Sequence, residues 1–395
     1  MSKVMVIAGG AWQAPLIKKI KRMGHNVLCT NLYDDTEGIQ LADERVVANV
    51  LDKEKNLQIA KEYVPDIVIT DQSDIAVPMV AYVSQEMGLP GIGTDKASLF
   101  TNKYLMREFE KMNGFKQPKY KLCQKYEDAQ EFLEEVSKAI IKPLNSQSSR
   151  GVFIVEKGQD FNEKFESSKG YTNGQDGLII EEYIEGTEFT VDGIKIGQKH
   201  HVLAISEKKH FKHNRSVASQ LYFSNKNDRV DYEKLSLLNT NLVTAMNLPF
   251  GLTHAEYKYS NGNFYLIEIA ARGGGTLISS DIVPIMSGID SNELIVRYML
   301  GEDVDFPEKK KENVVAILKF LELPSGKVKT ISGKEDIEKM NNVVKIHLSF
   351  KEGDEIKSAT DDSTRVGFYI AYADSDLELE ELCKKIETTL IVELE

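Results

Sequence analysis

The most informative stretch of the chain is LTHAEYKYSNGNFYLIEIAARGGGT, residues 252–276. It predicts two β-strands joined by a tight turn near Asn261-Gly262, followed by three glycines. A three-residue loop over 261–263 predicts that Glu256 on the first strand faces Glu268 on the second. A two-residue loop would place the two carboxylates on opposite faces, because side chains alternate along a strand. The second strand is expected to present Tyr265, Ile267 and Ile269 on an apolar face, with Glu268, Ala270 and Arg272 on the other.

Paired carboxylates on one face predict a metal site. Two such groups repel each other unless a positive charge lies between them. Oxygen ligands favour Mg²⁺ or Mn²⁺, so Glu256 and Glu268 are the candidate metal ligands, with a solvated polar hairpin as the alternative. Arg272 beside them suits a transferring phosphoryl group, because a guanidinium stabilises its charge in a bidentate way. A salt bridge followed by a flexible turn is the alternative for Arg272.

A second candidate site is AIIKPLNSQSSRGV, residues 139–152. Lys142 closes an apolar strand there, which is unusual because an unpaired buried ammonium is costly. The polar loop that follows suits phosphate binding through backbone N–H groups, although it lacks the residue order of a P-loop. Lys103, at the start of a helix, is another candidate phosphate ligand, with a solvated surface position as the alternative.

The pattern of strands and helices divides the chain into three parts. At the N-terminus, short apolar strands alternate with helices, which predicts a parallel sheet covered on both faces. One helix is expected over 95–113. Paired strands between about 118 and 272 then predict a mostly antiparallel α+β region. The expected domains are 1–95, then 96–305 with a small lobe at about 117–185, and a small mixed cap over 306–395.

Composition excludes several classes of protein. The 395 residues are 42% hydrophobic and 28% charged, which is typical of a soluble globular protein. A formal net charge of −12 argues against non-specific nucleic-acid binding. Cys29, Cys123 and Cys383 lack metal-ligand spacing, which argues against structural zinc. No stretch approaches the roughly 20 apolar residues of a membrane span. We therefore expect a cytoplasmic protein that contacts neither nucleic acid nor membrane.

Together these motifs resemble the ATP-grasp superfamily, in its carboxylate–amine ligase branch, which includes amino-acid ligases and has biotin carboxylase as a structural cousin. The resemblance implies a Rossmann-like N-terminal domain, an ATP-grasp domain with two α+β lobes, and a small C-terminal cap. It also implies ATP and Mg²⁺ or Mn²⁺ as cofactors. The motifs that carry it are, in order, NKYLMR at 102–107, IIKP at 140–143, IIEEYIEGTEF at 179–189, HAEYK at 254–258 and IEIAARGGG at 267–275.

The resemblance implies a role for each candidate residue. Glu256 and Glu268 would bind the metal, and Arg272 would steady the transition state with Lys142. One departure is Ala270, which stands where many members carry a further Asn ligand. The implied nucleotide ligands are Lys103 and Lys142 for the phosphates, Ser148, Ser149 and Gly151 in a lid loop, Glu181, Glu182, Tyr183 and Ile184 at the adenine hinge, with the backbone of Glu182 and Ile184 facing the base, and Glu188 at the ribose.

The implied reaction joins a small-molecule carboxylate to an amine or thiol through an acyl phosphate and releases ADP and phosphate. A homodimer is the usual assembly of such proteins. Two alternatives stay open: a bicarbonate-activating subunit like biotin carboxylase, and an ATP-binding regulatory protein of weak activity, which Ala270 suggests. The candidate substrate residues are His210, His213, Arg215, Gly274 and Ser279, each with an ordinary loop or surface position as its alternative.

Overall fold

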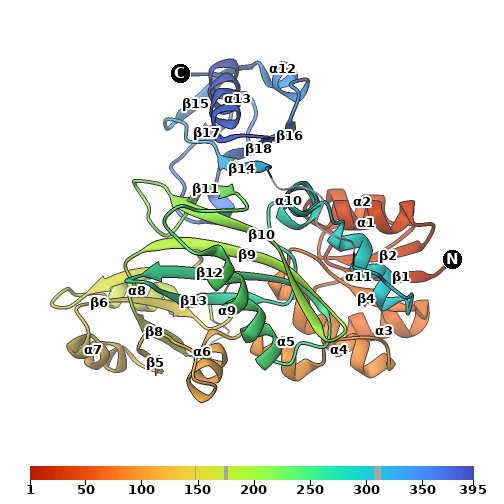
Figure 1. Ribbon diagram of the computed structural model, residues 1–395, viewed down its shortest axis with the longest axis horizontal. Helices are drawn as coiled ribbons and strands as arrows, with labels where there is room; N and C mark the ends of the chain where they lie inside the picture. Colours follow the sequence, from red (N-terminus) through yellow and green to blue (C-terminus); the bar gives the residue numbers. More distant parts are fainter. Residues whose placement is uncertain (147, 173–176, 307–312) are drawn as a thin grey trace.

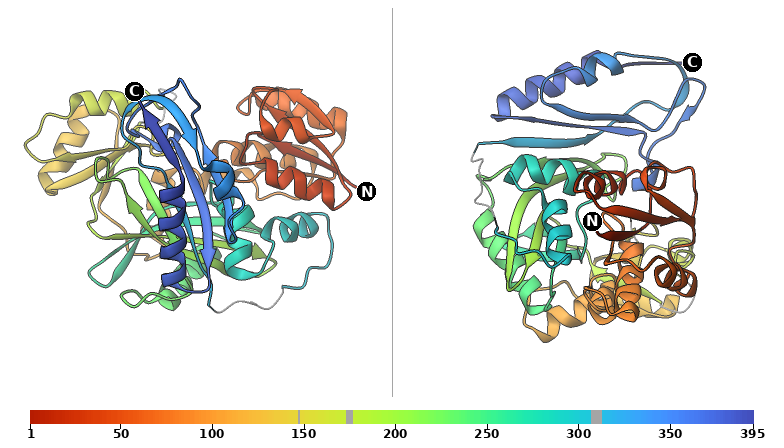
Figure 2. Two further views of the ribbon diagram at one scale, coloured as in Figure 1. Left: turned by 90° about the horizontal axis from the view of Figure 1, so that it is seen from above. Right: turned by 90° about the vertical axis from the view of Figure 1, so that its right-hand side faces the viewer.

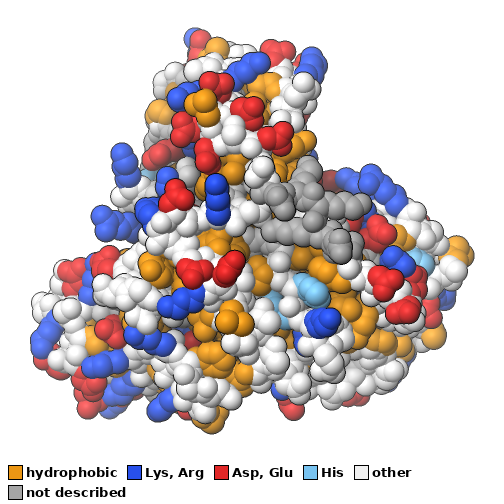
Figure 3. Space-filling model, in the orientation of Figure 1, with side chains coloured by type: hydrophobic (Ala, Val, Ile, Leu, Met, Phe, Trp, Pro, Cys, Tyr) orange, Lys and Arg blue, Asp and Glu red, His pale blue; other side chains and the backbone are white. Residues whose placement is uncertain are grey.

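The computed structural model describes residues 1–146, 148–172, 177–306 and 313–395. Four sheets organise it (Figure 1), and the N-terminal part and the small lobe lie on opposite sides of the largest one. No helix in the described ranges is long and apolar enough to cross a membrane. On the face shown in Figure 3, acidic and basic side chains are interspersed.

The N-terminal part is a four-stranded parallel sheet in the order β3-β2-β1-β4. Alternate residues of its central strand enter different cores: Val4 and Val6 pack towards the large sheet, and Met5 and Ile7 pack on the opposite side. This confirms the predicted parallel sheet with two covered faces. Its elements are β1 Lys3–Ile7, α1 Ala14–Arg22, β2 Asn26–Asn31, α2 Glu37–Leu41, β3 Glu44–Val47, α3 Lys53–Tyr63, β4 Ile67–Ile69, the 3₁₀ turn η1 Asp74–Ala76, and α4 Val77–Met87.

The single helix predicted over 95–113 is wrong. The structure has two helices, α5 Thr94–Leu99 and α6 Lys103–Met112. The break occurs because Asn102 takes an extended conformation and its side chain accepts hydrogen bonds from the N–H groups of Tyr104 and Leu105, at 3.0 and 3.1 Å. Asparagine at this position caps the helix by satisfying its first free donors. The cap places Lys103 in the first turn of α6.

A small antiparallel sheet, in the order β5-β8-β6-β7, forms the small lobe. Its apolar side packs against two helices through Phe132, Leu133, Phe161 and Phe165. The pairing places Lys142 of β6 beside β8, the strand that carries Glu181. The elements are β5 Tyr120–Cys123, α7 Tyr126–Glu135, β6 Lys138–Pro143, β7 Phe153–Glu156, α8 Asn162–Lys169 and β8 Leu178–Glu182.

The large sheet has eight strands in the order β13-β12-β9-β10-β11-β14-β18-β16. It continues across the domain boundary expected between 305 and 306, because β11 pairs with β14. That boundary adjoins residues 307–312, which lie outside the described residues. The strands are β9 Thr187–Ile196, β10 Lys199–His210, β11 Ala218–Phe223, β12 Gly251–Ser260, β13 Asn263–Ala270, β14 Val315–Phe320, β16 Val343–Leu348 and β18 Gly367–Ala373.

The C-terminal part stands at one end of the molecule, where it extends the large sheet (Figures 1 and 2). It adds a second small sheet in the order β17-β15-β19. Its other elements are β15 Gly326–Ser332, α12 Lys334–Glu338, β17 Glu355–Ile356, η3 Asp362–Thr364, α13 Asp376–Thr389 and β19 Ile391–Leu394, and the helices against the large sheet are α9 Tyr232–Ala245, the π-helical turn η2 Ile278–Ile282, α10 Val283–Ser287 and α11 Ser291–Met299.

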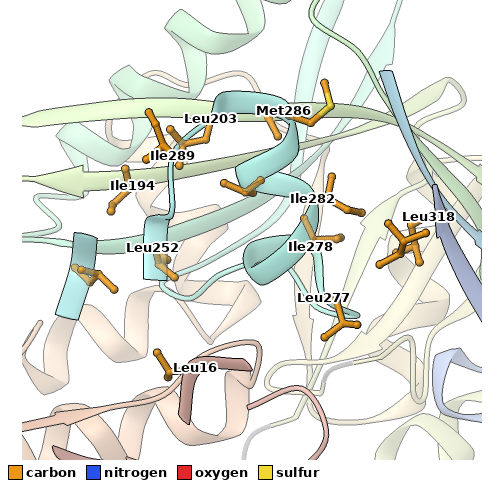
Figure 4. Packing of buried hydrophobic residues seen from close by; sticks show 14 of the residues in the cluster. Leu16, Ile194, Leu203, Leu252, Leu277, Ile278, Ile282, Met286, Ile289 and Leu318 are labelled. Atoms are coloured by element: carbon orange, nitrogen blue, oxygen red, sulfur yellow. The ribbon is translucent and has the colours of Figure 1, made fainter. Parts of the chain in front are cut away.

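One hydrophobic core connects the N-terminal part to the large sheet (Figure 4). Leu16 of α1 belongs to the same cluster as Ile194 of β9 and Leu252 of β12. The segment 277–289 contributes Leu277, Ile278, Ile282, Met286 and Ile289 to it. Packing of this kind fixes the glycine run 273–275, which lies just before that segment, against the end of the parallel sheet.

Candidate functional site

The β12–β13 hairpin brings Glu256 directly opposite Glu268. The three-residue loop predicted for it is wrong: Ser260 pairs with Asn263, so the turn has two residues, Asn261 and Gly262, with φ of 49° and 76°. Such a turn alone would separate the carboxylates. They face each other because the register shifts by one residue between Glu256 and Tyr257, which leaves Ile267 as the extra residue of a β-bulge.

The bulge also changes which side chains of β13 share a face. Phe264, Leu266 and Ile269 enter the hydrophobic core. The predicted apolar face of Tyr265, Ile267 and Ile269 is therefore wrong, because Tyr265 and Ile267 line the same pocket as Glu268. One inserted residue inverts the alternation that the sequence indicates.

A pocket of roughly 950 Å³, counted with its open mouth, lies between the small lobe and the large sheet. This size suits a drug-sized ligand. Of the residues predicted from sequence, its walls include Lys103, Lys142, Ser148, Ser149, Glu181, Glu182, Tyr183, Ile184, Glu188, His210, Arg215, Glu256 and Glu268. Five predicted residues lie outside its walls: Gly151, His213, Arg272, Gly274 and Ser279.

One end of the pocket, here called the hinge end, is a buried charge network of Lys142, Glu181, Arg107 and Glu110. Lys142 Nζ lies 2.7 Å from Glu181 Oε2, and Arg107 Nε lies 2.9 Å from Glu181 Oε1. Arg107 also bonds Glu110 at 2.6 Å. Burial lowers the pKa of Lys142. Burial acts to raise the pKa of Glu181, but Arg107 and Lys142 outweigh it and lower that pKa, so the carboxylate stays charged.

The backbone that follows β8 is the segment predicted to bind a planar base, so the partners of its N–H groups are informative. The Glu182 N–H donates to the Lys119 carbonyl at 2.9 Å, and the Tyr183 N–H donates to the Lys138 carbonyl at 3.0 Å. Among the described residues, the Ile184 N–H makes no such bond. The backbone groups of Glu182 and Ile184 are the ones predicted to face a base; the Ile184 N–H is available for this, whereas the Glu182 N–H is engaged.

The other end, here called the metal end, holds the paired carboxylates Glu256 and Glu268, each in contact with one lysine. Lys103 Nζ lies 3.0 Å from Glu268 Oε2 and 2.8 Å from the Ser146 carbonyl. Lys208 Nζ lies 2.9 Å from Glu256 Oε2. Burial acts to raise the pKa of Glu268, but Lys103 and Lys142 lower it to about 2. Glu268 is thus available as a charged oxygen donor, and Glu256 lies opposite it.

The donor set at the metal end fits Mg²⁺ that shares its coordination with a phosphate. Within the described ranges, no group of three or more His, Cys, Asp or Glu side chains is arranged to hold a metal. Mg²⁺ is usually held by one or two carboxylates together with substrate phosphates rather than by a protein cage. Glu256 and Glu268 provide two carboxylates. Lys208 and Lys103 contact them in this structure and balance their charge.

Glu188, the residue predicted at a ribose, lies beside two lysines and a histidine. Lys208 lies 2.6 Å from it, Lys258 3.2 Å and His210 3.4 Å. Burial acts to raise the pKa of Glu188, but Lys208 and its neighbours hold it well below its usual range. The charged carboxylate can accept hydrogen bonds from hydroxyl groups within the pocket.

Arg272 lies outside the pocket, contrary to the position expected of a residue that steadies a transferring group. Its guanidinium forms a bidentate pair with Asp74, at 2.9 and 2.6 Å, and donates to the Gly273 carbonyl. Burial acts to lower the pKa of Arg272, but Asp74 outweighs it and raises that pKa, with smaller contributions from the charges of Glu268 and Glu256. Arg272 is therefore near the metal end, and a partner from the N-terminal part holds it.

The glycine run is tied to the same N-terminal loop by Asp71. The Gly273 N–H donates to this carboxylate at 3.1 Å, and the Ser279 hydroxyl donates to it at 2.6 Å. Burial raises the pKa of Asp71. A Cβ on Gly274 would lie 2.5 Å from an oxygen of Asp192. Ser279 and Gly274 thus support the fold around the site in this structure, and neither faces the pocket as predicted for a substrate residue.

The lid loop touches the C-terminal part. The Ser149 hydroxyl donates to the Ser216 carbonyl at 3.0 Å, and the Asp362 N–H donates to the Ser148 carbonyl at 3.3 Å. Gly151 has φ of 70°, and a Cβ there would meet Tyr171 and Pro143, so its role is conformational. His213 contacts the Ala359 carbonyl outside the pocket.

Three charged residues that line the pocket were not predicted from the sequence: Arg107, Lys208 and Lys258. A signal existed for two of them. Arg107 follows Lys103 by four residues, which places both on one face of a helix. Lys258 follows Glu256 by two residues, on the same face of a strand. Lys208 stands in a long polar strand whose sequence does not distinguish it from Lys209.

Comparisons with known proteins agree with this geometry. Residues 136–281 match the family described as ATP-grasp domain, and residues 319–395 match L-amino acid ligase C-terminal domain 2. A phosphoribosylamine–glycine ligase of Methanocaldococcus jannaschii is 29% identical over 212 residues, which is 49% of this chain and 47% of the relative. The chain thus matches about half the length of such relatives.

Solved structures share the whole fold. An L-amino acid ligase from Bacillus licheniformis superposes with a TM-score of 0.83 at 21% identity, over 100% of this chain and 99% of that one. A phosphoribosylglycinamide synthetase from Anaerococcus prevotii gives 0.78 at 20% identity, over 100% of both. The chain therefore contains an ATP-grasp domain, at residues 136–281, and an L-amino acid ligase C-terminal domain, at residues 319–395.

Proposed function

We propose that this protein is an ATP-dependent ligase that activates a carboxylate as an acyl phosphate and transfers it to an amine, with release of ADP and phosphate. The observation that carries the proposal is the opposition of Glu256 and Glu268 in a pocket that also holds Lys103 and Lys142. The two lysines complement the charge of a nucleoside triphosphate, and the two carboxylates complement the charge of its divalent cation.

In the proposed complex, the base lies at the hinge end near the Ile184 N–H and the triphosphate extends to the metal end. Lys142 and Lys103 contact the phosphates, and Glu188 accepts from ribose hydroxyls. Glu256 and Glu268 would hold Mg²⁺, which supplies neutralisation of the charge that develops on the phosphate oxygens. A biotin carboxylase domain of similar fold from Hydrogenobacter thermophilus, at 16% identity, was crystallised with ADP and its magnesium salt.

The reaction needs no protein nucleophile. An oxygen of the substrate carboxylate attacks the γ-phosphorus, the bond to the bridging oxygen breaks, and ADP leaves. The amine nitrogen then attacks the acyl carbon, phosphate leaves, and the amine proton passes to solvent. Lys142 and Lys103 stabilise charge during the first step. The lid loop, which includes Ser148, Ser149 and Gly151, would exclude water, because acyl phosphates hydrolyse.

We infer that the activated carboxylate belongs to an amino acid. Two findings support this class: the C-terminal match to an L-amino acid ligase domain, and relatives that are named as ligases of glycine. The amine is then a second amino acid. The second candidate, favoured by those relatives, is a phosphoribosylamine as the acceptor of glycine.

A phosphate-release screen tests the proposal. The purified chain is given MgATP with each of the twenty amino acids, singly, in pairs and with hydroxylamine, and ADP and AMP are separated by chromatography. We expect ADP and phosphate with a subset of amino acids, and hydroxamate when hydroxylamine replaces the amine. AMP with pyrophosphate would refute an acyl phosphate. Bicarbonate-dependent turnover would favour the biotin-carboxylase-like alternative, and ATP binding without turnover would favour a regulatory protein.

The two candidate acceptors are separated by product analysis. Mass spectrometry distinguishes a dipeptide from a glycinamide ribonucleotide when glycine is offered with a second amino acid or with phosphoribosylamine. A Glu268→Gln protein is the control in both arms, because it keeps the pocket's shape and removes one negative charge from the metal end.

A further inference from the structure

The β-bulge at Ile267 creates the metal end, and something must hold it in place. Continued without a bulge, the register that pairs Ser260 with Asn263 would place Glu256 opposite Ile267 and turn Glu268 to the other face. The bulged residue of such a pair is left out of the regular hydrogen-bond ladder. The position of one backbone carbonyl therefore decides whether two carboxylates meet.

The buried guanidinium of Arg107 contacts that carbonyl. Arg107 is 1% exposed, and its NH2 group donates to the Ile267 oxygen at 2.7 Å. The same guanidinium bonds Glu181 through Nε at 2.9 Å and Glu110 through NH1 at 2.6 Å. Helix α6, strand β8 and strand β13 thus meet at one planar group whose five N–H donors have fixed directions.

The placement of these contacts links the two ends of the pocket. Glu181 is the carboxylate that Lys142 contacts at the hinge end. Ile267 immediately precedes Glu268, the carboxylate that Lys103 contacts at the metal end. Lys103 and Arg107 lie one turn apart on α6, so the helix presents Lys103 to β13 and Arg107 to both β8 and β13.

We propose that Arg107 is a positioning residue that locks the bulge at Ile267 and so keeps Glu268 opposite Glu256 for metal binding, while it fixes Glu181 beside Lys142. The assignment rests on the proposed function only for the identity of the ligand. A lysine at this position keeps the charge but cannot bond Glu181 and the Ile267 carbonyl in one plane.

The register is tested first, without nucleotide or metal. In a Glu256→Cys, Glu268→Cys protein, opposed Cβ atoms about 4.5–5.5 Å apart need to approach by at most about 1 Å to reach disulfide geometry, so a cross-link can form under mild oxidation. The three natural cysteines are buried. We expect addition of Arg107→Lys to slow this cross-link at least fivefold, whereas Glu110→Gln leaves it within twofold. Equal cross-linking in both backgrounds would overturn the proposal.

The metal site is tested second, by binding rather than turnover. Free Mn²⁺ is counted by electron paramagnetic resonance in the presence of ADP. We expect Arg107→Lys to weaken Mn²⁺ binding at least tenfold and Glu110→Gln to change it less than threefold. If Arg107 only neutralised buried carboxylates, Arg107→Lys and Glu110→Gln would change Mn²⁺ binding by the same factor. That result would contradict the proposal.

Deletion of Ile267 provides a variant that leaves every side-chain partner of Arg107 in place. It removes the extra residue, so the register that pairs Ser260 with Asn263 places Glu268 opposite Glu256 without a bulge, and we expect the cross-link to form. Arg107→Lys should no longer slow the cross-link in this background, because the bulge through which Arg107 acts is gone. A cross-link that Arg107→Lys still slows in the deletion protein, or that fails to form there, would contradict the proposed lock. The cross-link test stands even if the phosphate-release screen finds no ligase activity.

Discussion

The two ends of the pocket differ in how their charged side chains are paired and in how far these side chains are exposed. At the hinge end the side chains of Arg107 and Glu181 are 1% and 4% exposed, and each charge has a protein partner of opposite sign. At the metal end the Glu268 side chain is 35% exposed and shares one lysine contact. The hinge end is thus complete without ligand. The metal end holds carboxylates that an incoming cation and phosphate can engage, which separates a structural charge network from a binding site.

The largest effect is expected from Glu268→Gln, which removes a charge from the metal end. We expect turnover to fall by about 10²–10³-fold, the loss typical of deleting one electrostatic group that stabilises a transition state. The unfolding temperature should change little, because this side chain is partly exposed. Steady-state phosphate release over a Mg²⁺ titration measures both the rate and the apparent metal affinity. Full turnover in this variant would remove the metal assignment, and Glu256→Gln is its matched partner.

The difference between the two ends also explains what the sequence could predict. The parallel sheet was predictable because Val4 to Ile7 form an apolar run buried on both faces. Lys142 was recognisable because a lysine that closes such a run is unusual. The bulge at Ile267 was not, since a single-residue shift leaves no compositional trace, and the pairing of Glu256 with Glu268 was predicted correctly from a wrong loop.

Long-range partners were the other limit of sequence reasoning. Asp74 follows β4 in a polar stretch, and nothing local indicates that it will bind Arg272, which is 198 residues away. The same holds for Asp71 and Ser279, which are 208 residues apart. Their positions depend on how the N-terminal sheet packs against the large sheet, and hydrophobic periodicity does not specify that packing. Residue type alone therefore pointed Arg272 towards the pocket.

A pair of lysine variants sharpens the comparison. Lys142→Met leaves Glu181 buried with Arg107 as its remaining partner, so we expect a loss of about 3 kcal/mol in the free energy of unfolding. Lys103→Met leaves the partly exposed Glu268 and should cost under about 1 kcal/mol. Both should raise the KM for ATP. Urea denaturation measures the first difference and initial rates the second; equal stability losses would mean that the two ends are alike.

The hinge end also has a pH signature, carried by Glu110. Burial raises the pKa of its carboxyl from 4.5 to about 7, although Arg107 acts to lower it. Because the folded-state pKa is raised, its contribution to stability is complete below about pH 4.5 and is lost as the pH rises through 7. The other charged groups that influence it are Glu181 of β8 and Lys142 of β6.

Glu110→Gln should therefore flatten the change in stability between pH 4.5 and 7. At about 1.4 kcal/mol per pKa unit, the shift from 4.5 to about 7 amounts to at most about 3–4 kcal/mol. Denaturation midpoints of both proteins across this range give the measurement. The metal end offers a control: Glu268→Gln should leave the slope in that interval unchanged, because the pKa of Glu268 is about 2. A wild-type slope retained in Glu110→Gln would assign the titration to another group.

The smallest effect is expected in the glycine run that follows the metal end. A Cβ at Gly274 would lie 2.5 Å from Asp192 Oδ1 and 2.8 Å from Ile278, whereas a Cβ at Gly275 would have nothing within 4 Å. Gly274→Ala should cost about 1–3 kcal/mol through overpacking, and Gly275→Ala should stay within about 0.5 kcal/mol of wild type, as is usual for changes that touch nothing. Thermal unfolding compares the two. Activity adds a further distinction: if the run serves only to let the backbone approach Asp192, Gly275→Ala keeps full turnover, whereas a loss there without a loss of stability would show that Gly275 approaches the substrate itself.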